Sequence, residues 1–272
     1  MNKLIASLFL TLFLFSCSEK NTNTDNVQAD SIQTTNNSTI NAGATLADKL
    51  DGLWISESYL KNIETRQSIY KSREYDSKVL GFSLDKKTML SDTAMLEGFT
   101  THEGGYSSLI KYDTSKGKFV NNLEKVSEYA AFPEPFELNY DGGTILEMFF
   151  PKTNKTDRYR KVDTNLDTEL RRILIAGDYK IGNDGSVIHF DSDGKVQNFQ
   201  DFKSYELVYD FGEGIEYDAI IFFKDVKAGN WVDGVTYTFK KTPNSLRLQY
   251  VNTNWDTMEH KISDEVLVLE KK

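Results

Sequence analysis

Val187-Ile188-His189-Phe190 is followed by Asp191-Ser192-Asp193-Gly194 and then by Lys195-Val196-Gln197-Asn198-Phe199. Apolar and polar side chains alternate in both outer segments, which is typical of strands with one buried face. The central four residues end in Asp-Gly, a pair that favours a tight hairpin turn. They lack the downstream glutamate that a calcium-binding loop requires. The stretch therefore predicts two antiparallel strands joined by a turn.

The same alternation recurs through the C-terminal half of the chain, in residues 205–211, 237–240, 246–250 and 265–269. Residues 219–223 form a continuous apolar run, which predicts a more central strand. The chain has only 4 prolines, so turns that contain glycine separate most of these segments. Strands joined in sequence by short turns favour an all-β fold, an antiparallel meander barrel or sandwich, over a parallel sheet.

A few short helices are expected at 45–50, 59–64 and 167–175, where apolar residues have helical spacing. Two of them suggest an internal duplication. Leu46-Ala47-Asp48-Lys49-Leu50 precedes Gly52-Leu53-Trp54, and Leu170-Arg171-Arg172-Ile173-Leu174 precedes Gly177-Asp178-Tyr179. The two glycines lie 125 residues apart (177 minus 52). The sequence thus predicts two small tandem barrels, at 46–163 and 164–272, with one larger elaborated barrel as the alternative.

Gly52 and Trp54, at the start of a predicted up-and-down meander, resemble the first strand of lipocalin-like proteins. The resemblance implies a barrel whose closed end is plugged by the tryptophan. The second half departs from the pattern because Tyr179 takes the place of the tryptophan. Residues 54–60, and the chain onward to 70–71, also resemble the N-termini of uncharacterised lipoproteins of Bacteroidota. That likeness implies location and fold, and it transfers no catalytic residue.

The N-terminus has the pattern of a targeting signal. Lys3 precedes residues 4–15, which are apolar except for Ser7 and Thr11. This run is shorter than the ~20 residues that a membrane-spanning helix needs, and it suits a cleaved signal. Leu14-Phe15-Ser16-Cys17-Ser18 resembles the lipobox of bacterial lipoproteins, which implies a signal peptide at 1–16 and lipidation of Cys17. The alternative is a plain secretory signal followed by an incidental cysteine.

Residues 17–45 are polar and predict a lipidated cysteine followed by a disordered tether. The expected location is the cell envelope, anchored to the outer membrane through Cys17, with the leaflet left open. The formal net charge is -9, and removing Lys3 with the signal makes it -10. An acidic domain of this kind argues against nucleic acid and against electrostatic binding to anionic lipid.

The sequence predicts no metal site, no cofactor and no catalytic residue. His102, His189 and His260 are the only histidines and lie far apart in sequence, and Cys17 is the only cysteine. The acidic residues Asp210, Glu213, Glu216 and Asp218 surround two glycines. Paired carboxylates hydrolyse glycosides, but solvated loop charges are the commoner explanation of such a run.

Trp231 and Trp255 lie in polar, turn-like surroundings. Each could bind a ligand, by stacking on a sugar ring or by lining a barrel mouth. The alternative is that each side chain folds back and caps the core.

Three functions are compatible with these sequence features. The leading hypothesis is a membrane-anchored, non-enzymatic binding protein for a small apolar or amphipathic ligand held in a barrel cavity. The second is an envelope scaffold with a filled barrel, which contacts protein or glycan through its surface. The third is a glycan-active hydrolase that uses the acidic loop. An interior lined by small and apolar residues favours the first hypothesis, and a packed interior with clustered surface aromatics favours the second.

Overall fold

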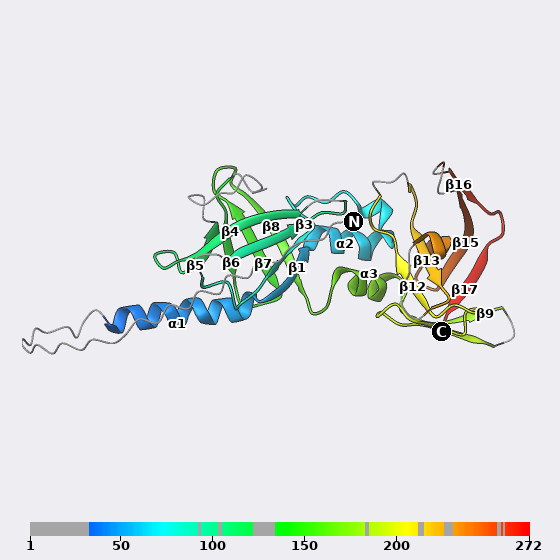
Figure 1. Ribbon diagram of the computed structural model, residues 1–272, viewed down its shortest axis with the longest axis horizontal. Helices are drawn as coiled ribbons and strands as arrows, with labels where there is room; N and C mark the ends of the chain where they lie inside the picture. Colours follow the sequence, from blue (N-terminus) through cyan, green and yellow to red (C-terminus); the bar gives the residue numbers. More distant parts are fainter. Residues whose placement is uncertain are drawn as a thin grey trace, which may run out of the picture.

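The computed structural model describes residues 33–91, 94–102, 105–121, 134–182, 185–211, 215–225, 231–254, 257 and 259–272, with only the backbone of 33–40 and 106. The chain is mostly β and folds into two antiparallel barrels in sequence order. Figure 1 shows the first barrel on the left, the second on the right, and two helices between them. The expectation of an all-β meander is confirmed. One larger barrel, the alternative, is wrong.

The first barrel is a closed up-and-down barrel, in which each strand pairs with the next and the last pairs with the first. Its strands are β1 (Gly52–Ser56), β2 (Gly81–Leu84), β3 (Met95–Phe99), β4 (Gly105–Asp113), β5 (Lys118–Asn121), β6 (Glu137–Tyr140), β7 (Ile145–Phe150) and β8 (Lys155–Val162).

The second barrel repeats this order and is nearly closed. Its strands are β9 (Gly177–Ile181), β10 (Val187–Phe190), β11 (Val196–Gln197), β12 (Ser204–Leu207), β13 (Ala219–Phe223), β14 (Val235–Thr242), β15 (Ser245–Asn254) and β17 (Leu267–Lys271), and β16 (Glu259–Ile262) pairs with β15 alone. A single bridge between Lys195 and Ser204 joins β11 to β12. The hairpin predicted at 187–199 is confirmed as β10, a turn and β11.

The two barrels begin in the same way, which supports the predicted duplication. Gly52 and Gly177 have φ angles of 121° and 137°, a conformation that favours glycine. Two residues later, the Trp54 indole N–H donates to the Leu50 carbonyl at 2.8 Å. The Tyr179 hydroxyl donates to the Ile175 carbonyl, also at 2.8 Å. In each half, an aromatic side chain of the first strand therefore satisfies a backbone carbonyl at the end of the preceding helix.

Large side chains fill both barrels. The first encloses the fully buried Trp54, Phe82, Phe119, Phe136, Phe150 and Tyr159. The second encloses Tyr179, Phe190, Phe199, Tyr205 and Phe222, whose rings contact one another edge-on or tilted. Eight strands leave an interior that side chains alone can fill. The described interiors are packed cores.

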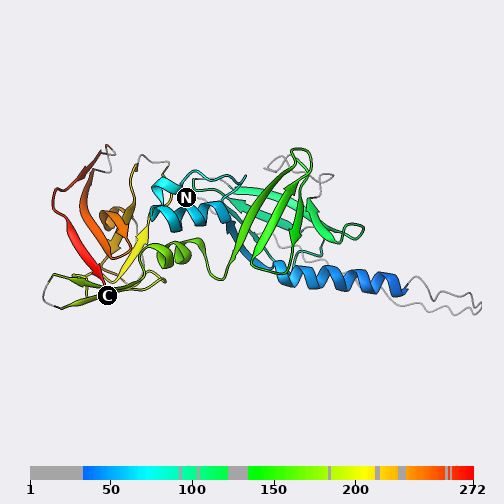
Figure 2. The same cartoon turned by 180° about the vertical axis from the view of Figure 1, so that it is seen from behind.

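The first helix corrects one expectation. α1 (Gln33–Leu50) begins within the segment predicted to be a disordered tether through residue 45. Gly43, Ala47 and Leu50, four and three residues apart, are buried on one face, and Ala47 and Leu50 belong to the core of the first barrel. The helix expected at 45–50 is confirmed as the C-terminal part of α1, and the part before it was missed because residues 33–44 contain few apolar side chains. Figures 1 and 2 show α1 extending from the first barrel away from the second.

The helices between the barrels pack their apolar residues into the core of the second barrel, while the interior of the first barrel forms a separate buried cluster. α2 (Glu57–Arg66) and the single-turn η1 (Tyr70–Ser72) are inserted between β1 and β2, and α3 (Leu166–Leu174) connects the barrels. Ion pairs of Arg158 with Glu57 and of Arg160 with Glu64 fasten α2 to β8. The apolar side of α2 contains Tyr59, Leu60 and Ile63, and it belongs to the same buried cluster as the interior of the second barrel.

We predict that Gly52→Ala and Gly177→Ala each lower the free energy of unfolding by about 1–3 kcal/mol, because a Cβ strains the backbone at these φ angles. Urea denaturation followed by circular dichroism measures the loss. Gly143→Ala is the matched control, because Gly143 lacks a positive φ and the nearest atom to an added Cβ is on the flexible Asp141 side chain. A loss no larger than the control's at both glycines would contradict the role assigned to them.

Candidate functional site

The candidate site is an open cleft of about 400 Å³ at the junction of the two barrels. The first barrel contributes the segment that follows β3, and the second contributes β12, the residues after it and η3 (Trp231–Asp233). α3 contributes one residue from its first turn. The lining residues are Thr100, Thr101, His102, Asp167, Glu206, Leu207, Tyr209, Asp210 and Trp231.

Trp231 is half-buried and has two roles in this geometry. Its indole N–H donates to the Glu206 carboxylate at 2.8 Å, which fixes the ring at the edge of the cleft. The ring also packs against a small apolar cluster on the outer face of β13, built around Ile221 and Phe223. Both interpretations of Trp231 from the sequence thus have a structural basis: the side chain covers core residues and also lines a cleft.

β13 is buried along its whole length, as expected for a more central strand.

His102 and Asp210 connect the two barrels across the cleft. The His102 Nδ1 atom lies 2.7 Å from Asp210 Oδ1, and the two side chains remain 56% and 34% exposed. An exposed pair of this kind contributes little to stability, ~0–1 kcal/mol. Its importance is geometric, because it ties the loop after β3 to the segment after β12.

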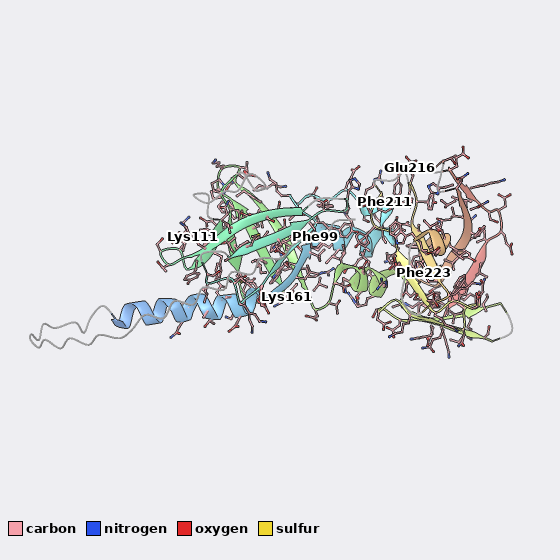
Figure 3. All side chains as sticks on the ribbon, in the orientation of Figure 1. Phe99, Lys111, Lys161, Phe211, Glu216 and Phe223 are labelled. Atoms are coloured by element: carbon pink, nitrogen blue, oxygen red, sulfur yellow. The ribbon has the colours of Figure 1, made fainter. Side chains whose placement is uncertain are left out.

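Asp218 holds the junction from a second side. Its carboxylate accepts hydrogen bonds from the Ser68 hydroxyl at 2.6 Å and from the Tyr70 backbone N–H at 2.8 Å. The Tyr70 ring lies edge-on to Phe211, with ring centroids 5.3 Å apart. Figure 3 shows Phe211 beside α2 and Phe99 where the first barrel meets the helices. The inserted segment of the first barrel is therefore bound to the second barrel by polar and apolar contacts.

The predicted acidic run divides between different places. Asp210 lines the cleft, Asp218 binds the junction and Glu216 is exposed. Glu213 lies outside the described residues. Because Asp218 already accepts hydrogen bonds from Ser68 and Tyr70, its observed contacts are those of a structural carboxylate. These positions give no support to a paired-carboxylate mechanism.

Other residues singled out from the sequence lie apart from the cleft. Cys17 and Trp255 lie outside the described residues. His189 pairs with Asp178 across β9 and β10 at 2.7 Å, and His260 lies 3.1 Å from the Thr253 hydroxyl across β15 and β16. Within the described residues, no group of three or more His, Cys, Asp or Glu side chains could hold a metal ion. In the same part of the chain, every helix is too short or too polar to cross a membrane.

Most of the cleft has no signal in the sequence that would identify it as a site. Tyr209 and Glu206 are visible only as parts of an alternating strand, and Asp167 only as a residue of a predicted helix. Thr100 and Thr101 carry no local signal at all. These residues become a site because four separate segments converge, and that convergence depends on the junction.

Comparisons of the chain with protein-family models, with curated proteins and with solved structures find no match.

Burial raises the pKa of Asp218 above its usual range, against the opposing hydrogen bonds from Ser68, Tyr70 and Ile69. The folded protein therefore keeps this proton to a higher pH than the unfolded chain, in which the pKa is about 3.9. The stabilisation from Asp218 is present below that pH and is lost as the pH rises through the folded-state pKa. We predict that the free energy of unfolding of wild type falls relative to that of Asp218→Asn as the pH is raised from about 4 to about 8. Urea denaturation at each pH measures both values.

Glu216→Gln is the control, because this neighbouring carboxylate is exposed. Its difference from wild type should vary less with pH than that of Asp218→Asn. A difference between wild type and Asp218→Asn that stays constant, or that grows in favour of wild type as the pH rises, would contradict the assignment.

Proposed function

We propose that this protein is a non-enzymatic, saccharide-binding lipoprotein of the cell envelope. Cys17 carries the lipid anchor, and the two filled barrels form the scaffold. The ligand lies in the cleft at their junction. This proposal takes the second of the three hypotheses from the sequence and gives it a site.

The observation that carries the proposal is the position of Trp231 in the cleft. Its ring is half-buried and fixed by the hydrogen bond to Glu206, so little conformational entropy is lost when a ligand packs against it. Tyr209 supplies a second partly exposed aromatic side chain on the same lining. Aromatic faces pack against the C–H surface of a sugar ring, and neighbouring polar groups bind its hydroxyls.

The charge of the lining narrows the ligand class. Three carboxylates, Asp167, Glu206 and Asp210, face the cleft together with two threonines, and the described lining contains neither lysine nor arginine. Carboxylates and threonine hydroxyls accept hydrogen bonds from sugar hydroxyl or amino groups. Carboxylates also repel uronates and phosphates. A neutral or amine-bearing saccharide is therefore the favoured ligand.

The packed interiors support this choice over a carrier for a small apolar molecule. Such a carrier needs an apolar cavity inside the barrel. Trp54 and Phe119 in the first barrel, and Phe190 and Tyr205 in the second, are at most 1% exposed and occupy that space.

We predict that Trp231→Ala weakens saccharide binding about tenfold or more, corresponding to ~1.4 kcal/mol of lost stacking. Trp231→Phe should lose less, because it keeps an aromatic face. The full-length protein in detergent is first screened against a panel of neutral, amine-bearing and uronate oligosaccharides. Isothermal titration calorimetry then measures the dissociation constant for the best ligand.

Tyr250→Ala is the matched control, because Tyr250 is an aromatic side chain that is 45% exposed on the second barrel and does not line the cleft. Its affinity should equal that of wild type. Binding that survives Trp231→Ala unchanged, or a preference for uronates, would contradict the proposed site. Native mass spectrometry of the same preparation tests the carrier hypothesis, since a retained apolar molecule would restore it.

A further inference from the structure

The strand registers of the two barrels identify one position at which the halves differ sharply. In the first barrel, a path across neighbouring strands runs from Tyr140 on β6 to Leu146 on β7 and Tyr159 on β8. It ends on β1 at Ser56, which lies two residues after Trp54. In the second barrel, the same path leads from Lys241 through Leu246 and Leu269 to Ile181, two residues after Tyr179. Lys241 therefore occupies the place of Tyr140.

The equivalent residues make equivalent contacts. Tyr140 lies edge-on to Trp54, with ring centroids 5.9 Å apart. The Lys241 Nζ atom lies 4.8 Å from the centre of the Tyr179 ring and 2.5 Å from its hydroxyl oxygen. The Tyr179 hydroxyl donates its proton to the Ile175 carbonyl, so it accepts a hydrogen bond from the amine. The change from tryptophan to tyrosine thus provides an acceptor for a buried lysine.

This amine is not required by the fold. The first barrel fills the same position with an aromatic side chain, which avoids the cost of burying an amine. Lys241 is only 8% exposed, and it forms no ion pair with any carboxylate in the described part of the chain. Lys161, which faces the ring of Trp54 in the first barrel, instead binds the Lys49 carbonyl on the exposed surface. A buried lysine without a carboxylate partner is unusual and marks a candidate site for chemistry.

The surroundings also favour the neutral, nucleophilic form of the amine. Burial, and secondarily the positive charge of Lys271, lower the pKa of Lys241 to about 8. Lysines acquire nucleophilic reactivity in proteins through these two influences, desolvation and a neighbouring cation.

We propose that Lys241 is a nucleophilic lysine that captures small aldehydes as imines at the rim of the second barrel, beside the end of α3. The site is independent of the saccharide cleft. Because Lys241 is almost fully buried, only a small aldehyde can reach its amine.

The reaction balances without a cofactor. The Nζ lone pair of the neutral amine attacks the carbonyl carbon, and a C–N bond forms as the carbonyl π electrons move to oxygen. The resulting carbinolamine loses that oxygen as water, together with the two amine protons, and a C=N bond remains. No electrons are gained or lost. Tyr179 is the positioning residue, because its hydroxyl oxygen fixes the amine by accepting its hydrogen bond.

The test compares two adjacent lysines in one chain. Full-length protein in detergent is treated with propanal and cyanoborohydride at pH 7, and peptide mapping by tandem mass spectrometry follows the alkylation rate of each lysine. Lys240, on the exposed face of the same strand, is the internal control. We expect Lys241 to react about tenfold faster or more, because a lower pKa raises the fraction of neutral amine. A rate for Lys241 equal to or below that of Lys240 overturns the proposal.

Two variants complete the test. Lys241→Met should abolish the fast alkylation and leave the rate at Lys240 unchanged; fast alkylation that persists would assign it to another lysine and overturn the proposal. Tyr179→Phe should reduce the ratio of the two rates, because the amine loses its positioning hydrogen bond. An unchanged ratio in Tyr179→Phe would overturn the role of Tyr179. The wild-type comparison requires no variant to fold.

Discussion

The apolar side of α2 belongs to the core of the second barrel, although α2 is inserted between two strands of the first. Tyr59, Leu60 and Ile63 are fully buried in the cluster that also contains the interior of the second barrel. Ion pairs from Arg158 and Arg160 hold the polar side of the same helix against β8. One short helix is therefore shared between two barrels. The cleft lies at this junction, where Ser68 and Tyr70 bind Asp218 and where the His102–Asp210 pair holds the loop after β3 beside the segment that follows β12.

The two barrels follow one plan, and both proposed activities arise where the halves depart from it. Each barrel begins with a glycine that has a positive φ angle, followed two residues later by an aromatic residue. The side chain of that aromatic residue donates a hydrogen bond to a backbone carbonyl at the end of the preceding helix. The first barrel adds the insertion that builds the junction, and the second replaces Trp54 by Tyr179 and Tyr140 by Lys241. Packing thus accounts for what the halves share, and the two proposals concern the places where the halves differ.

The features that could be predicted from the sequence are those with a local signal. The Asp-Gly turn at 193–194 predicts its hairpin because turn geometry depends on a few adjacent residues. The duplication could be predicted because a short leucine-rich helix followed by Gly-x-aromatic is a local pattern that occurs twice, at Gly52 and at Gly177. The cleft could not be predicted, because Thr100, Asp167 and Trp231 are brought together by packing between distant segments. The contacts of Asp218 with Ser68 and Tyr70, and of Lys241 with Tyr179, could not be predicted for the same reason. Burial and strand register depend on the assembled barrels.

A helix shared in this way should make the two barrels one cooperative unit. Differential scanning calorimetry of the full-length protein measures that cooperativity, with Leu60→Ala as the perturbation. We expect a single transition whose calorimetric and van't Hoff enthalpies agree, and a shift of that whole transition to lower temperature in Leu60→Ala. Two separate transitions in wild type, or a variant in which only one of two transitions moves, would contradict the sharing of α2.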